Sequence, residues 1–295
     1  MPDHDVNHRE NVVAALRHTG PSRLPRGELF FTKTFLDTVF PESSQNYSKQ
    51  LSSAAQLLDL SLVGVDLNGE WSRSLLRQGA YGNLRKYFTV GYINGPVLHA
   101  IAQLGFKQAM ISIKKDRTTF SRAASSLFED IQEICKIAKK NDISAILLPD
   151  DIAGNKGLYF SKNDFDAVIL PWYKQIASEI IGNDLFAFFH SDGDTRSIIE
   201  PLIKAGYDCI HPIDSQAGLD LYELKNIHKN MICFMGHIDI VTWDDEQISR
   251  EISKAEKNFK DGGLIFGSTC GLSMKTVSKK LSSLYPRWHR MDKKI

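Results

Sequence analysis

The feature that most constrains the fold is a repeated alternation of short apolar runs with longer amphipathic stretches. Such runs are typical of parallel strands that alternate with helices. We identify eight of them, each bounded by turn-forming residues: 28–32, 62–67, 87–93, 144–149, 185–190, 209–212, 231–235 and 264–267. No glycine-rich dinucleotide fingerprint or Walker phosphate loop indicates an open doubly wound sheet. The alternation therefore predicts an α/β fold, a single (β/α)₈ TIM barrel.

The segments between the strands have the spacing of amphipathic helices. Apolar residues recur every three or four positions over 120–138 and again over 248–259, which predicts a helix before the fourth strand and another before the last. No linker, repeat or low-complexity tract divides the chain. We therefore expect one domain over 1–295, with an N-terminal helix and loop at about 1–27 capping the barrel.

Composition excludes several classes of function. A net charge of +1 provides no field that would gather nucleic acid or anionic lipid. The apolar runs are too short to span a bilayer. Four cysteines in 295 residues do not make a disulfide framework, and no apolar leader opens the chain. These properties predict a reduced, cytoplasmic enzyme without nucleic-acid or membrane partners, and they leave a homodimer open.

A barrel places its catalytic groups at the carboxyl ends of the strands, and polar residues gather there in this sequence. Turns favour Asp and Asn for backbone reasons alone, so about half of these residues are expected to be only caps or turn formers. The candidates that follow the predicted strands are Asp66, Tyr92, Asn94, Asp151, His190, Asp192, His211, Asp214, Asp239 and Cys270.

His190 and Asp192 stand out among these candidates. Residues two apart on a strand project to the same face, so both side chains can point into the barrel mouth. Such a pair supplies either two metal ligands or an acid and a base. Cys270 follows the eighth strand, between two glycines, and its thiol can reach the same mouth. A set of His, Asp and Cys suits zinc with one coordination position open to substrate.

Longer stretches resemble a known family. The segment 189–208 reads FHSDGDTRSIIEPLIKAGYD. The other matching stretches stand in the expected order: RENVVAALR at 9–17, LPRGE at 24–28, NGP at 94–96, DDIAG at 150–154 and GHID at 236–239. Together they resemble the uroporphyrinogen decarboxylase-like superfamily, which also contains corrinoid-dependent methyltransferases. The resemblance covers nearly the whole chain and implies a (β/α)₈ barrel with its site at the carboxyl-terminal mouth.

The resemblance favours the methyltransferase branch. True uroporphyrinogen decarboxylases carry an arginine-rich Met-Arg-Gln-Ala-Gly-Arg loop near the N-terminus, and residues 23–33 here lack it. A polycarboxylate would then lose its bidentate partners. The thiol-methylating members of the superfamily bind zinc through a His-x-Cys motif and a distant Cys, which His190 and Cys270 match. Asp192 departs from that pattern by replacing the middle thiolate.

A carboxylate in place of a thiolate makes zinc a stronger Lewis acid. The resemblance then implies a zinc-assisted methyl transfer between a small methylated substrate and a corrinoid, with O-demethylation of a methoxy compound favoured. A partner corrinoid protein would dock over the mouth, because this chain has no Asp-x-His-x-x-Gly cobalamin motif. We expect metal ligation by His190, Asp192 and Cys270, catalysis by Asp151, His211 and Asp239, and substrate binding by Asp66, Tyr92, Asn94 and Asp214.

Two other functions stay open on the same scaffold. One is a metal-free decarboxylase or lyase that uses the Asp and His residues at the mouth. The other is a non-catalytic corrinoid- or tetrapyrrole-binding protein.

Overall fold

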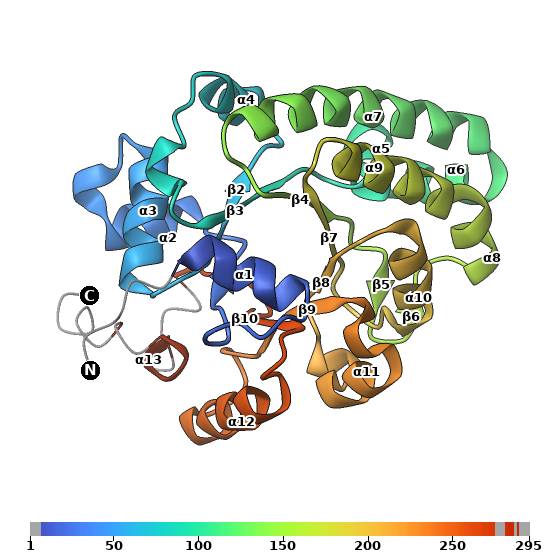
Figure 1. The fold of residues 1–295 in the computed structure, drawn as a ribbon. Helices are drawn as coiled ribbons and strands as arrows, with labels where there is room; N and C mark the ends of the chain where they lie inside the picture. The colour runs from blue at the N-terminus through green and yellow to red at the C-terminus, as the bar shows by residue number, and fades with distance from the viewer. Residues whose placement is uncertain (1–6, 275–280, 286–287, 289–295) are drawn as a thin grey trace.

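A computed structural model describes residues 7–274, 281–285 and 288 (Figure 1). Within these residues, eight parallel strands form one sheet in the order β1-β2-β3-β4-β7-β8-β9-β10. A parallel bridge between Arg26 and Phe266 links the first strand to the last, which brings the ring close to closure. The predicted (β/α)₈ barrel is confirmed. Its strands are β1 (Gly27–Glu28), β2 (Leu62–Asp66), β3 (Phe88–Tyr92), β4 (Ala145–Pro149), β7 (Phe186–His190), β8 (Cys209–His211), β9 (Cys233–Ile238) and β10 (Leu264–Ser268).

Helices connect the strands and cover the outside of the ring. In the described part of the chain they are α1 (His8–Leu16), α2 (Lys33–Val39), α3 (Tyr47–Leu57), α4 (Glu70–Arg77), α5 (Pro96–Leu104), α6 (Phe106–Lys115), α7 (Arg117–Lys140), α8 (Lys162–Asp164), α9 (Leu170–Gly182), α10 (Arg196–Ala205), α11 (Leu221–His228), α12 (Asp245–Asn258) and α13 (Leu281–Leu284). The two helices expected from apolar spacing are α7 and α12. A small hairpin, β5 (Ala153–Gly154) with β6 (Gly157–Leu158), follows β4.

Two strands differ from their predicted limits by more than one residue at an end. The first is only two residues long, and the chain beyond it keeps a single bridge from Phe31 to Leu272. The seventh, predicted at 231–235, lies at Cys233–Ile238. Lys229 has a φ of 50°, so the residues after α11 turn instead of extending. The strand therefore starts later, and His237 lies inside it.

Alternation along the strands decides which side chains face the barrel axis. Phe188 and Cys209 belong to the cluster that fills the barrel, whereas Phe189 and Ile210 pack outward against the helices. His190 and His211 follow two residues after the inward pair, and they are register partners on neighbouring strands. Both imidazoles therefore point inward at the carboxyl ends of β7 and β8.

Helix α1 closes the opposite end of the ring. The amide of Gly263, just before β10, donates to the Ala15 carbonyl at 2.8 Å, and Val12 and Leu16 pack into the barrel core. Figure 1 shows α1 lying across the centre of the ring of strands. Residues 1–6 of the expected N-terminal cap lie outside the described residues. Among the helices that are described, none combines the length and apolar character needed to cross a bilayer.

Candidate functional site

The loops after β4 and β7 are fastened to each other at the barrel mouth. The backbone N–H of Asp192 donates to Asp151 Oδ1 at 3.1 Å, and that of Ile152 donates to Ser191 Oγ, also at 3.1 Å. Gly193 has a φ of 88°, and a Cβ there would lie 2.7 Å from the Ala153 carbonyl carbon. Only glycine permits both this conformation and this approach. The packing of these loops fixes the separation of Asp151 and Asp192.

Three side chains converge where these loops meet. His190 Nε2 lies 3.4 Å from Asp151 Oδ1 and 4.0 Å from Asp192 Oδ1. One ligand atom from each of the three lies within 4.8 Å of the others, a spacing that fits a common metal ion. We call Asp151, His190 and Asp192 the carboxylate–histidine triad. Imidazole nitrogen and carboxylate oxygen are both zinc ligands, and a catalytic zinc site keeps one position open to substrate.

The two carboxylates of the triad differ in pKa: burial raises the pKa of Asp192, whereas that of Asp151 is lowered. Burial alone would raise the pKa of Asp151. The hydrogen bond and positive charge of His190, together with the Asp192 amide, nevertheless hold it below its usual value. Asp151 is therefore an anionic donor at neutral pH. Asp192 is the outermost member, with a side chain 63% exposed.

Hydrogen bonds behind the triad determine which nitrogen of His190 carries a proton. His211 Nε2 lies 3.2 Å from the Ser268 carbonyl oxygen, which can only accept, so this nitrogen is protonated. Burial and then the neighbouring His190 lower the pKa of His211 well below its usual value, so its ring is neutral and its Nδ1 holds a lone pair. His190 Nδ1 lies 2.8 Å from that atom and must donate to it.

With Nδ1 donating to His211, the Nε2 edge of His190 faces two carboxylates. A proton or a metal ion at Nε2 offsets the negative charge there. This is the arrangement of a metal-binding histidine whose other ring nitrogen is held by a hydrogen bond. The residues present therefore fit zinc, and the fit rests on the hydrogen-bond network as well as on the donor types.

Gly236 makes room for His211. Its φ is 87°, and a Cβ there would lie 3.1 Å from His211 Nε2. The next residue, His237, also has a positive φ, and its Nε2 lies 3.1 Å from Glu251 on α12. His237 therefore packs against a helix and does not join the triad.

The structure brings together only part of the predicted set. Cys270 is not in the triad, and Asp151 takes its place in the grouping of potential ligands. Cys270 instead lines a cavity of about 340 Å³ together with Asp192 and Asp214. Burial, followed by nearby carboxylates, raises the pKa of its thiol to about 11, so it is protonated at neutral pH.

The three residues expected to act in catalysis occupy different environments. Asp151 belongs to the triad. His211 is buried behind His190. Asp239 accepts from the amides of Val241 and Thr242 at 2.9 Å, from the Thr242 hydroxyl, and from Gln216 Nε2 at 2.6 Å. Its oxygens are thus used to fasten the loop after β9.

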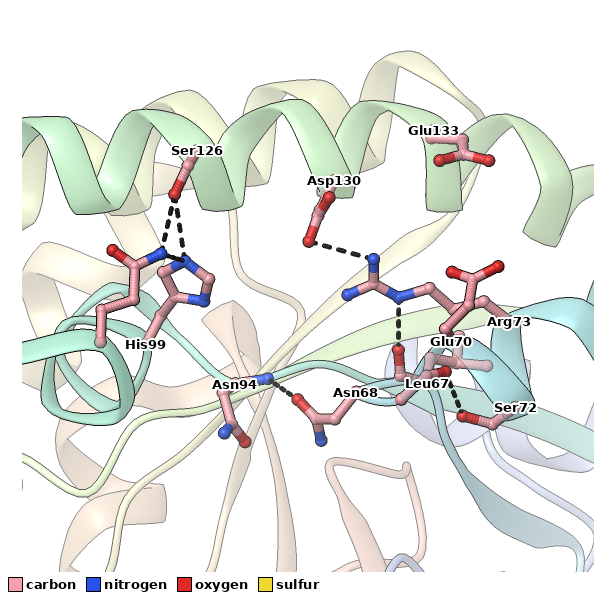
Figure 2. A network of polar contacts seen from close by, with 12 residues as sticks. Leu67, Asn68, Glu70, Ser72, Arg73, Asn94, His99, Ser126, Asp130 and Glu133 are labelled. Carbon is pink, nitrogen blue, oxygen red and sulfur yellow. Dashed lines mark hydrogen bonds and ion pairs between the residues drawn. The ribbon is translucent and has the colours of Figure 1, made fainter.

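The residues expected to bind substrate divide between two cavities. Asp66 and Tyr92 line a cavity of about 590 Å³ beside β2 and β3, and Asp214 lines the smaller one. The backbone N–H of Asn94 donates to Asn68 Oδ1 at 2.7 Å, so Asn94 supports the loop after β2, as Figure 2 shows.

Phe30 is a site residue that sequence reasoning missed. Its ring centroid lies 5.1 Å from His190, 5.9 Å from His211 and 5.1 Å from Tyr92, in edge-on contacts. It therefore lies between the triad and the larger cavity. Strand alternation does not predict this position: Leu29 belongs to the cluster that fills the barrel, so strict alternation would place Phe30 outward. Strand β1 ends at Glu28, and the chain beyond it no longer follows the alternation.

Comparisons with known proteins agree with this fold. The family model described as "Uroporphyrinogen decarboxylase (URO-D)" matches residues 81–291. A methyltransferase from Methanosarcina mazei is similar in structure, with a TM-score of 0.72 and 13% identity over 98% of this chain and 100% of that one. An endo-1,4-beta-mannanase from Rhizomucor miehei has a TM-score of 0.55 and 13% identity, over 92% of this chain and 96% of that one.

At these identities the structural likeness shows the fold. A search of curated proteins finds no match. The family match covers more than half of the chain and confirms the resemblance seen in its motifs. The chain belongs to the uroporphyrinogen decarboxylase family.

Proposed function

We propose that this protein is a zinc-assisted methyltransferase that moves a methyl group between a small methylated substrate and a corrinoid carried by a partner protein. The observation that carries the proposal is the position of His190 Nε2, which the hydrogen bond between His190 Nδ1 and His211 holds toward Asp151 and Asp192. The fold that it shares with a methyltransferase supports the reaction class. We place the reaction in the cytoplasm.

The residues present would divide the work as follows. Asp151, His190 and Asp192 would hold zinc, which as a Lewis acid would polarise the methyl-bearing atom of the substrate, favouring a methoxy oxygen. His211 keeps the His190 ring in its tautomer. Asp192 and Asp214 line the cavity of about 340 Å³ next to the triad, where substrate would enter. A corrinoid protein would cover the mouth from outside.

Porphyrinogen decarboxylation has less support. Arg23 lies 2.7 Å from Asp59 in an ion pair just before β2, at the amino ends of the strands. The Arg26 guanidinium is largely buried, and this burial lowers its pKa. Neither arginine belongs to the residues that line the two cavities at the mouth.

The experiment combines metal analysis with a cobalamin absorbance assay. Purified protein should hold about one zinc per chain and should methylate a corrinoid protein, or demethylate it, with a methoxy or thiol substrate. Asp151→Asn and Cys270→Ser, measured side by side, identify the third ligand. We expect Asp151→Asn to lose metal and Cys270→Ser to keep it.

Three other results would replace the proposal. If the protein turns over without stoichiometric metal and His190→Ala does not slow it, zinc takes no part in the reaction. Release of carbon dioxide without any corrinoid protein would identify a lyase. Tight tetrapyrrole binding without turnover, indifferent to His190→Ala, would identify a binding protein.

A further inference from the structure

The cavity beside β2 and β3 has a chemical character that the proposed reaction does not explain. It encloses about 590 Å³, and its lining includes Tyr47, Trp71, Tyr92 and the carboxylate of Asp66. The rings of Tyr47 and Trp71 stand 6.1 Å apart at 53°, so their faces form two inclined walls. We call this cavity the aromatic pocket.

Asp66 gives the aromatic pocket a negative charge. Its Oδ1 accepts from the backbone and side-chain nitrogens of Asn68, both at 2.9 Å, and both donors are uncharged. Burial and then the charge of Asp66 raise the pKa of Tyr47 to about 12. The carboxylate therefore acts on the aromatic wall at close range.

The cation in the same lining is already paired. Lys33 Nζ lies 3.0 and 2.8 Å from the two oxygens of Asp37, one turn along α2. Among the described residues, no Lys or Arg forms an ion pair with Asp66. The unbalanced charge of the aromatic pocket is thus negative.

The loop that carries Asp66 and Trp71 is held in place before any ligand arrives. Arg73 Nε donates to the Leu67 carbonyl at 2.9 Å, and its Nη1 lies 3.0 Å from Asp130 on α7. Asn68 accepts from the Asn94 amide, and Ser72 donates to the Gly69 carbonyl at 2.9 Å. Figure 2 shows these contacts tying the loop after β2 to β3 and α7. A fixed wall lowers the entropy cost of binding.

We propose that the aromatic pocket binds the methylated ammonium head group of a small molecule. A quaternary ammonium has no N–H to donate, and the faces of Trp and Tyr attract it through their quadrupoles. Asp66 adds a Coulomb attraction that a neutral group of the same shape does not receive. An anionic ligand would be repelled. This site goes beyond the proposed function, and its ligand binding requires neither metal nor corrinoid.

The position of the aromatic pocket links it to the triad. Tyr92 lines the pocket, and the Phe30 ring lies 5.1 Å from both Tyr92 and His190. A small molecule anchored by its cationic end would thus lie one ring away from the triad. If the proposed function holds, that molecule would be the substrate: its head group would bind here, and a different part of it would react at the triad.

The test compares choline with its neutral isostere 3,3-dimethylbutan-1-ol by titration calorimetry on the full chain. We expect choline to bind at least about tenfold more tightly, because only it carries the charge. Asp66→Asn should weaken choline binding about tenfold and leave the alcohol unchanged. Trp71→Leu should weaken choline about tenfold, and Trp71→Phe should restore part of the loss.

Two surface variants serve as matched controls. Asp142→Asn removes an exposed carboxylate, and Phe106→Leu removes an exposed ring on α6; both should bind choline as the natural sequence does. Equal binding of choline and the alcohol, undiminished choline binding in Asp66→Asn, or no choline binding at millimolar concentration would each overturn the proposal. Zinc content measured on the same samples tests the proposed function separately.

Discussion

Two sectors of the barrel mouth differ in how their polar groups are held. On the β7–β8 side, His190 and His211 are buried, hydrogen-bonded to each other and fixed by strand register. On the β2–β3 side, Asp66 stands in a half-open cavity and Trp71 is 65% exposed. A histidine that binds a metal through one ring nitrogen needs a fixed orientation. A carboxylate and aromatic faces that attract a cation do not. On the two proposals above, the β7–β8 side is the reaction sector and the β2–β3 side is the recognition sector.

Asp150 joins the two sectors. Its carboxylate accepts from the amides of Val97 at 3.0 Å and Leu98 at 2.7 Å, at the start of α5, and from the Tyr173 hydroxyl at 2.8 Å. A Cβ at Gly95 would lie 2.5 Å from the Asp150 side chain, so only glycine permits this approach. The NGP and DDIAG motifs of the sequence thus meet through one buried carboxyl group.

The largest effect is expected from removing His190. In His190→Ala the protein should lose its metal, and turnover should fall about 10³-fold or more, because a Lewis acid supplies several kcal/mol of transition-state stabilisation. Metal per chain and initial rate are the measurements. His99→Ala is the matched control, since His99 lies on α5 and bonds Ser126 on α7 and Gln103 on α5. If both variants keep metal and rate, the reaction sector lies elsewhere.

His211→Phe tests the tautomer assignment. The ring would still fill its space, but His190 Nδ1 would lose its acceptor. We expect metal affinity to fall roughly 10–100-fold, as is usual when the hydrogen-bond partner of a ligand is removed. Competition with a chromophoric chelator measures the affinity. A variant that only unfolds at lower urea, with unchanged affinity in its folded state, would show that His211 is structural.

Asp150→Asn tests the link between the sectors. The amide leaves one of three buried donors without an acceptor, which should cost about 2–3 kcal/mol of unfolding free energy. Urea denaturation followed by circular dichroism gives the value. Asp142→Asn, at the exposed surface, should stay within about 0.5 kcal/mol of the natural sequence. A loss of equal size in both variants would contradict the assignment.

The smallest effect concerns pH. Glu28 accepts from the Ser268 amide and hydroxyl and from the Tyr285 hydroxyl, and burial raises its pKa to about 7. In the unfolded chain the carboxyl ionises near about pH 4, so its contribution to stability is complete below that pH and is lost as pH rises towards 7.

Glu28→Gln cannot ionise and should lose this part of the pH dependence. The amide adds a pH-independent cost for the donor it leaves unmatched, so the test is the change with pH: relative to the natural sequence, the variant should gain about 1 kcal/mol or more between pH 4 and pH 8. Urea titrations at the two pH values measure the difference. Asp150, whose pKa burial also raises to about 7, leaves a residual slope in both proteins. If the two proteins show the same pH profile, the ionisation of Glu28 does not contribute to the pH dependence of stability.

The sequence by itself determined the barrel and the place of the candidate site. Apolar runs of strand length report local burial, and alternation placed His190 on the inward face, because both are properties of neighbouring residues. It also picked out Asp66 and Tyr92, which line the aromatic pocket with Tyr47 and Trp71.

Only the tertiary structure decided which side chains meet. Asp151, rather than Cys270, joins His190 and Asp192, because Gly193 lets the loops after β4 and β7 touch. His211 fixes the tautomer of His190 through strand register, whereas His237 turns to Glu251 at a positive φ. These contacts join residues far apart in the chain. Their geometry depends on loop packing, and loop packing leaves no periodic pattern in the sequence.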